Sequence, residues 1–322
     1  MKKRNNIKLF IIVLILQIVL IAYLIGKIHK KSSALGVYKI NPINKDSFPL
    51  SAKSDLKVFF EPVPNKTDRQ EVSGIPGKMA SYTINSDSLN ERYDYKMANN
   101  ESKYRIITLG DSFTFGMFVD TKNNYPEQLE DKLNNFGCAS GKKFDVINLG
   151  VIDYDIQASV ERYRLRGQKY NPELLVWLLK DDDFLQVNEL NFLEVGRLIN
   201  EGYEKSFKEG KEKLTTDEKA IENTFKIYGE EKILNMQKKF LPLIRKYYKN
   251  KILFVVMTDN SKYTNIVNDF VKKDENSIIY DTFTLYDDNL RFIDKHPNEK
   301  GYSIFSDELF TYLREKKIIP CD

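Results

Sequence analysis

The chain is poor in the residues that most often build metal sites and disulfide frameworks. Its 322 residues include two cysteines, two histidines and one tryptophan. A structural zinc site needs about four Cys or His ligands, and the chain has no Cys-x-x-Cys motif, so no metal site is predicted. Cys138 and Cys321 could form one disulfide in an oxidising compartment or remain two free thiols, and the sequence leaves both alternatives open.

A strong excess of charge of one sign is also missing. The chain has 50 Lys and Arg against 46 Asp and Glu, a net charge of +4, with both signs mixed along the sequence. This balance predicts no nucleic-acid partner. The apolar share of 42% and the charged share of 30% are typical of a globular protein rather than a disordered chain.

Long hydrophobic runs are absent with one exception, Leu9–Gly26, which only Gln17 interrupts. As a helix this run would span roughly 27 Å, close to the thickness of a bilayer's hydrocarbon core. It is longer than the ~7–15 apolar residues of a signal peptide. Residues 1–31 are therefore predicted to form an uncleaved transmembrane anchor. A cleaved signal peptide and a buried soluble helix are the alternatives.

The charges that flank this run predict its orientation. Four basic residues precede it and three follow it: Lys2, Lys3, Arg4 and Lys8, then Lys27, Lys30 and Lys31. The excess on the N-terminal side predicts a cytoplasmic N-terminus. We therefore expect a single-pass membrane protein whose soluble body lies outside the cytoplasm.

Strand-like and helix-like segments alternate in the C-terminal two thirds of the chain. Residues 32–100 are polar and turn-rich, and they are predicted to be a linker and an irregular β lead-in to a main domain at residues 101–317. Within that domain, apolar runs of strand length occur at 104–109, 144–150, 172–180, 251–258 and 277–283. Helical patterns separate them, which predicts an α/β three-layer sandwich with a central, mainly parallel sheet.

A Lys/Glu-rich segment, residues 188–240, interrupts this alternation after the third strand. It is predicted to be a helical insertion. Such a charge mixture is usual on a solvated helical face, whereas its position beside the ends of the strands would also suit a cap over a site.

Ser112 follows the first strand of this domain, in LGDSFTFG. Functional residues of parallel α/β sheets lie at the carboxyl ends of the strands, and a serine hydroxyl there becomes a nucleophile if a base takes its proton. The alternatives are a simple turn that caps the next helix and a phosphate-binding loop. The latter would lack the glycine spacing and the lysine of known phosphate loops.

His296, in DKHPNEKGY, is the one histidine of the predicted soluble body, because His29 lies in the basic cluster beside the anchor. Asp294 precedes it by two residues, and in an extended segment the two side chains share a face. The carboxylate could then orient the imidazole and leave its other nitrogen free to act as a base. Alternatively, His296 merely precedes a helix capped by Asn298.

Taken together, these motifs resemble the blocks of the GDSL, or SGNH, family of serine hydrolases. The resemblance is carried by LGDSFTFG with YPEQLE behind it, VINLGV, DKHPNEKGY and the lead-in YTINSDSLNERY. It spans about Ala80–Leu313, apart from the insertion. It implies the flavodoxin-like SGNH hydrolase fold, no cofactor and no metal. The implied roles are Ser112 as nucleophile, His296 as base, Asp294 as orienting acid, and the N–H groups of Ser112 and Gly150 as oxyanion donors.

The family acts mostly on acyl esters, often on acetyl groups carried by sugars. With the predicted location, the resemblance implies a membrane-anchored serine esterase whose candidate substrates are O-acyl, above all O-acetyl, esters on envelope glycans. An acyltransferase of the same fold and a catalytically silent binding module are the alternatives.

Two features depart from the family pattern. The third block is usually Gly-x-Asn-Asp, whose Asn donates to the oxyanion, but here Lys180–Asp183 reads KDDD and Asp182 stands at the Asn position. An ionised carboxylate cannot donate a hydrogen bond, whereas a protonated Asp182 could serve as an oxyanion donor if burial raised its pKa substantially. Backbone donors alone could suffice, Lys180 or Asn188 could supply the missing donor, or the site could be weak or silent. The second departure is the spacing of acid and histidine, two residues here and three in many members.

Overall fold

The computed structural model describes residues 38–42, 58–97, 103–136, 141–201 and 216–321. The expected anchor at residues 1–31 lies outside these ranges, as does Cys138. Within the ranges, no helix combines the length and the apolar character needed to cross a membrane. Cys321 is buried and disulfide-bonded. The anchor, its orientation and the location of the soluble body therefore remain predictions.

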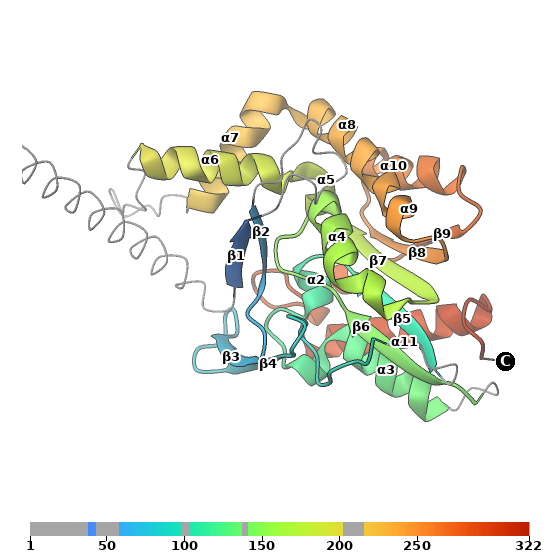
Figure 1. Cartoon of the computed structure of the whole chain (residues 1–322). Coiled ribbons are helices and arrows are strands. Elements are labelled where there is room, and N and C mark those ends of the chain that lie inside the picture. Colours follow the sequence, from blue (N-terminus) through green and yellow to red (C-terminus); the bar gives the residue numbers. More distant parts are fainter. Residues whose placement is uncertain (1–37, 43–57, 98–102, 137–140, 202–215, 322) are drawn as a thin grey trace, which may run out of the picture.

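A five-stranded parallel sheet forms the centre of the described structure (Figure 1). Its spatial order is β6-β5-β7-β8-β9, and every neighbouring pair is parallel, which confirms the predicted α/β architecture. The strands are β5 (Lys103–Leu109), β6 (Lys143–Asn148), β7 (Leu174–Lys180), β8 (Lys251–Met257) and β9 (Ser277–Asp281). Every residue of the central strand β7 is buried, as expected for a strand covered on both faces.

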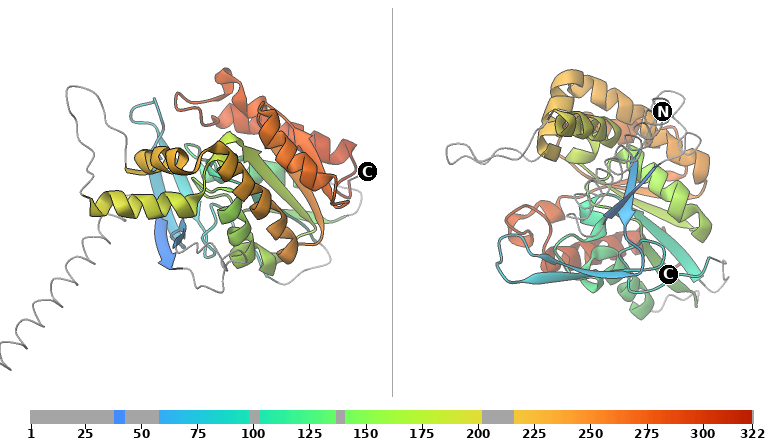
Figure 2. Two further views of the ribbon diagram at one scale, coloured as in Figure 1. Left: turned by 90° about the horizontal axis from the view of Figure 1, so that it is seen from above. Right: turned by 60° about the vertical axis from the view of Figure 1, so that its left-hand side comes forward.

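Helices cover both faces of this sheet and produce three layers (Figure 2). Alternate strand side chains enter two separate hydrophobic cores, one on each face, because successive residues of a strand point to opposite sides. The first face carries α3 (Tyr125–Phe136) and α11 (Glu299–Glu315), and the second carries α4 (Ile156–Arg162), α8 (Glu230–Phe240) and α10 (Ser261–Val271).

The strand order fixes where a site can form. From β5 the chain passes to β6 on one side, and later to β7 on the other side of β5. The connections therefore diverge at the carboxyl ends of β5 and β7, which leaves a crevice there in folds of this kind. Two short helices begin at these ends, α2 (Ser112–Phe115) after β5 and α5 (Asp181–Leu185) after β7.

Two antiparallel hairpins precede the sheet in sequence. The first pairs β1 (Tyr38–Pro42) with β2 (Val58–Pro62), and the second pairs β3 (Lys66–Glu71) with β4 (Met79–Ile84). Residues of the second hairpin pack against the segment that follows Ser112. The lead-in therefore contacts the neighbourhood of the predicted nucleophile.

The described parts of the Lys/Glu-rich segment after β7, within residues 188–201 and 216–240, are helical. Its helices α6 (Asn188–Asn200) and α7 (Thr216–Tyr228) pack against each other and extend beyond the sheet (Figure 1). Gly229, at φ +73°, separates α7 from α8. Leu190 of α6 and Tyr228 of α7 only pack against the core on one face of the sheet, whereas α8 contributes buried residues to that core. The short helix α9 (Ile244–Tyr247) then leads to β8.

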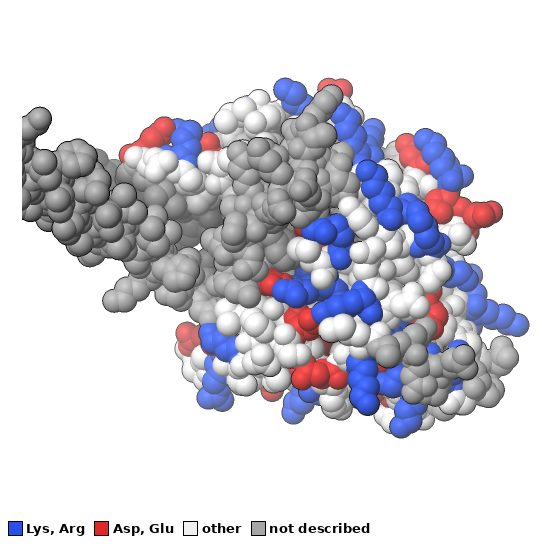
Figure 3. All heavy atoms as spheres, in the orientation of Figure 1, with Lys and Arg blue, Asp and Glu red and all other residues white. Residues whose placement is uncertain are grey.

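Charged side chains are spread over the face shown in Figure 3. Basic groups are more frequent than acidic groups across the part of this face that the described residues cover, and the acidic groups lie scattered among them. The sequence as a whole is nearly balanced, with 50 Lys and Arg against 46 Asp and Glu.

Candidate active site

Ser112 lies at the N-terminus of α2, in a tight turn directly after β5. Asp111 caps this helix, since its Oδ1 accepts from the Phe113 N–H at 2.9 Å. Gly110 has φ +148°, and a Cβ there would lie 2.4 Å from Thr114 Oγ1. Only glycine fits this turn without a shift, which explains the Gly-Asp-Ser sequence at the end of the strand.

Gly150 allows the end of β6 to pack closely on α2. A Cβ at Gly150 would lie 2.3 Å from the backbone nitrogen of Phe115. The Gly150 N–H, which was expected to be an oxyanion donor, already donates to Asn148 Oδ1 at 2.9 Å. The Ser112 N–H, in contrast, has no hydrogen-bond acceptor within the described ranges, as is usual in the first turn of a helix.

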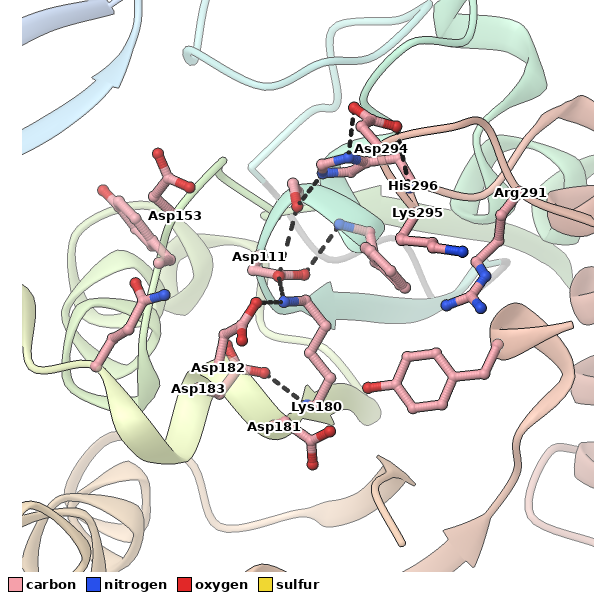
Figure 4. A pocket seen from close by; sticks show the side chains of 15 residues that line it. Asp111, Asp153, Lys180, Asp181, Asp182, Asp183, Arg291, Asp294, Lys295 and His296 are labelled. Atoms are coloured by element: carbon pink, nitrogen blue, oxygen red, sulfur yellow. Dashed lines mark hydrogen bonds and ion pairs between the residues drawn. The ribbon is translucent and has the colours of Figure 1, made fainter. Parts of the chain in front are cut away.

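His296 contacts Ser112 through one ring nitrogen and Asp294 through the other, and Figure 4 shows His296 beside Asp294. Its Nε2 is 2.9 Å from Ser112 Oγ, and its Nδ1 is 3.1 Å from Asp294 Oδ2. Asp294 Oδ1 also accepts from the backbone N–H of His296 at 3.2 Å. A proton on Nδ1 would therefore be held by the carboxylate, and the lone pair of Nε2 would face the serine hydroxyl. The two-residue spacing of acid and histidine is compatible with this contact.

Aromatic rings and backbone contacts hold His296 in place. Its ring lies 5.6 Å from that of Phe113 and 5.3 Å from that of Phe118. The backbone oxygen of His296 accepts from the Phe292 N–H at 2.8 Å. Between the acid and the histidine, Lys295 has φ +74°, an uncommon conformation for a side-chain-bearing residue. The loop that carries the imidazole is thus sharply turned and packed on the segment after Ser112.

The β3–β4 hairpin supports this arrangement, a role that was not predicted from the sequence. The Tyr82 hydroxyl accepts from the Phe118 N–H at 2.8 Å, and burial raises the pKa of Tyr82. Lys78, directly before β4, pairs with Glu299, the first residue of α11, at 3.3 Å. The signal was present in the sequence, because the alternating Ala80, Tyr82 and Ile84 indicate that one face of this strand is buried.

Asp182, which the resemblance predicts to stand at the Asn position of the third block, lines the pocket. Its side chain is 62% exposed, and its Oδ2 lies 2.5 Å from Lys180 Nζ. The Lys180 side chain is only 9% exposed, and its Nζ is also 2.9 Å from Asp111 Oδ2. The Asn188 amide points elsewhere, donating to the backbone oxygen of Asp153 at 2.6 Å. Of the two side chains considered as substitute donors, Lys180 lies at the site and Asn188 does not.

The charges around Lys180 keep it protonated. Burial alone would lower its pKa, but attraction by Asp111, Asp182 and Asp183 outweighs burial and raises the pKa well above the usual value. The pKa of Asp183 is also raised, but for a carboxyl group this shift favours the neutral form. Its burial, followed by repulsion from Asp111, raises the pKa of its carboxyl group well above the usual value. The carboxyl oxygen Oδ2 of Asp183 accepts from the Lys180 N–H at 2.7 Å.

These residues line a pocket of about 210 Å³ with mainly charged walls. Arg291 and Lys295 also line it, and Phe113, Tyr154 and Tyr286 are its aromatic walls. Residues 188–200 and 216–240 contribute no side chain to this lining, so the proposed cap is not seen in the described part of the insertion. The described residues contain no cluster of three or more His, Cys, Asp or Glu side chains arranged to hold a metal ion.

No family model and no curated protein matches the sequence. Solved structures of esterases do match. The chain is similar in fold to SGNH-type esterases. The esterase EstA from Pseudoalteromonas sp. is 12% identical, with 67% of this chain and 99% of that chain covered and a TM-score of 0.44. AlinE4, an SGNH-hydrolase family esterase, is 18% identical over 69% of this chain and 97% of that chain, with a TM-score of 0.39.

A family two carbohydrate esterase from Clostridium thermocellum is also similar. It is 15% identical, with 68% of this chain and 66% of that chain covered and a TM-score of 0.40. Because these identities are low, the similarities concern the fold alone. The chemistry of this site has to be argued from its own contacts.

Proposed function

We propose that this chain is a serine esterase that cleaves acyl esters with Ser112, His296 and Asp294. The observation that carries the proposal is the continuous line of contacts from Ser112 Oγ through the imidazole to the carboxylate, at 2.9 and 3.1 Å. These contacts have the order that a nucleophile, a base and an orienting acid require. A turn residue or a helix cap would not need such a partner.

The reaction would proceed in two halves. Ser112 Oγ attacks the carbonyl carbon while its proton passes to His296 Nε2, and the electrons of the carbonyl π bond move to the oxygen. Asp294 stabilises the resulting imidazolium. When the oxyanion collapses, the bond to the alcohol breaks and the alcohol takes the proton from Nε2. Water then attacks the acyl-enzyme by the same steps and releases the acid.

Oxyanion stabilisation begins at the backbone of the nucleophile. The Ser112 N–H is open at the N-terminus of α2, so it is the first donor that we assign to the developing charge. The Gly150 N–H would become a second donor only by sharing its bond to Asn148. A further donor is therefore required from a side chain.

The pocket favours small, polar esters. Its walls are mostly carboxylates and cations, and only Phe113, Tyr154 and Tyr286 offer aromatic surface. A long acyl chain gains binding energy by burying apolar area, which this lining provides sparingly. We therefore propose a small acyl group such as acetyl, on a hydroxyl-rich alcohol. With the predicted extracytoplasmic location, O-acetyl groups of envelope glycans fit this description.

The test uses the full-length protein in detergent with p-nitrophenyl esters of increasing acyl length. We expect the acetate to have the highest kcat/KM. Ser112→Ala and His296→Ala should each lower kcat by about 10⁴-fold or more. Product analysis with an added sugar acceptor separates hydrolysis from acyl transfer. Two results would contradict the proposal: a folded protein that cleaves none of these esters, or cleavage that is unchanged in Ser112→Ala.

A further inference from the structure

We propose that the Lys180 ammonium group is the side-chain donor to the oxyanion and that Asp182 positions it. This inference rests on the proposed esterase reaction and names a further catalytic residue for it. It also assigns a purpose to the KDDD sequence, which otherwise places a carboxylate where a donor is needed.

The contacts of Lys180 place its ammonium group beside the nucleophile. One carboxylate oxygen, Asp111 Oδ2, lies 2.9 Å from Lys180 Nζ and 3.5 Å from Ser112 Oγ. The ammonium group also lies 5.2 Å from the centre of the Phe113 ring, the residue next to the nucleophile. Figure 4 shows the Lys180 side chain directed toward Asp111, with Asp182 on its other side.

The ammonium group has one N–H that can donate a hydrogen bond to the oxyanion. It carries three N–H donors, and two are accounted for by Asp111 and Asp182. No other acceptor is in contact with Nζ in the part of the chain that the structure describes. The third N–H is therefore available to a carbonyl oxygen in the pocket, where an amide of Asn would otherwise donate.

The surrounding charges make this cation necessary. Asp111 and Asp182 would both repel a negative oxygen above Ser112 if no cation stood between them. Because the same carboxylates raise the pKa of Lys180, it keeps its proton throughout the reaction. The group therefore stabilises the oxyanion by hydrogen bonding and charge, and no proton is transferred from it.

Within the KDDD sequence, two residues differ from Gly-x-Asn-Asp, and their side chains contact each other. Lys180 replaces the Gly and Asp182 replaces the Asn, and the two side chains are paired at 2.5 Å. Asp182 is largely exposed and Lys180 is buried, so the carboxylate lies at the rim and the cation lies inside. We infer that this pair as a unit replaces a single amide.

Lys180→Met tests the role directly. This substitution removes the donor and keeps most of the volume of the side chain. We expect kcat for p-nitrophenyl acetate to fall by about 10²–10³-fold with little change in KM. The matched control is Lys103→Met, which removes another ion-paired lysine, bound to Asp145 at 2.6 Å, at the opposite end of β5. It should leave kcat unchanged.

A second substitution separates donation from simple charge balance. In the Lys180→Met background, Asp182→Asn restores an amide donor and should recover at least about tenfold of the lost kcat. Asp182→Ala removes the same charge and supplies no donor, so it should recover little. Equal recovery by both would mean that Lys180 only neutralises Asp182, and it would overturn the inference.

Further outcomes keep the inference distinct from the proposed function. A wild-type protein without Ser112-dependent hydrolysis would overturn both. An active wild type with an equally active Lys180→Met variant would overturn only the role of Lys180. If thermal unfolding shows that Lys180→Met does not fold, Asp182→Ala alone decides the question, because its site is exposed. Loss of positioning predicts a lower kcat with KM unchanged, and an unchanged or higher kcat would refute it.

Discussion

Replacing Gly150 by alanine should displace the turn that carries Ser112. The new Cβ would lie 2.3 Å from the Phe115 nitrogen and 2.8 Å from Thr114 Cβ, whereas ordinary contacts begin at 3.4 Å. The end of β6 and α2 would therefore have to separate by roughly 1 Å. Overpacking of this kind costs about 1–3 kcal/mol, and a ~1 Å misplacement of a reacting group costs about 10²-fold in rate.

The assay combines thermal unfolding with hydrolysis of p-nitrophenyl acetate. For a domain of this size, we expect Gly150→Ala to lower the Tm by about 2–4 °C per kcal/mol and to lower kcat more than it raises KM. The control is Gly196→Ala in α6, where nothing lies within 4 Å of the new Cβ, so stability should be equal or slightly higher. A Gly150→Ala protein with wild-type Tm and kcat would refute the close packing of β6 on α2.

Three further predictions follow from single contacts. Asp294→Asn should lower kcat by about 10⁴-fold with little change in Tm, because the imidazole loses the acceptor that sets its tautomer. Stopped assays at high enzyme concentration measure the residual activity. Tyr82→Phe leaves the buried Phe118 N–H without its acceptor, so urea unfolding should report a loss of about 1–3 kcal/mol. Burial raises the pKa of Glu130 to about 7, so the folded state binds its proton more tightly than the unfolded chain does. The resulting stabilisation is present below the unfolded pKa of 4.5 and is lost as the pH rises toward 7. Glu130→Gln should make the free energy of unfolding depend less on pH over this range, as measured by urea unfolding at several pH values. The same pH dependence in both proteins would contradict this prediction.

The strands and the Ser112–His296 pair were predictable from the sequence because their signals are local or rare. Buried parallel strands appear as short apolar runs, and a single histidine beyond the predicted anchor at residues 1–31 leaves few choices of base. The helical pattern between the strands at 144–150 and 172–180 corresponds to one continuous helical stretch, residues 156–170. It is α-helical over Ile156–Arg162 and continues as a π-helical turn over Tyr163–Gly167. Periodicity alone does not distinguish these two forms.

Features that depend on packing between distant segments could not be predicted in the same way. The support of Phe118 by Tyr82 joins residues 36 positions apart, and no local pattern states which element a buried strand face will meet. The bond from the Gly150 N–H to Asn148 depends on one side-chain rotamer. Lys180 was considered as a donor from its position in the sequence, but its place beside Asp111 emerged only from the folded chain.

The most direct test of the central claim is covalent labelling of the full-length protein by a fluorophosphonate probe, mapped by mass spectrometry. We expect one adduct, on Ser112, formed when its hydroxyl oxygen attacks phosphorus and displaces fluoride while its proton passes to His296. The adduct should be lost in His296→Ala, whose base is missing, while the fold persists by thermal unfolding. Absence of an adduct on the folded wild-type protein, or a Ser112 adduct that forms equally fast without His296, would contradict a serine nucleophile activated by histidine.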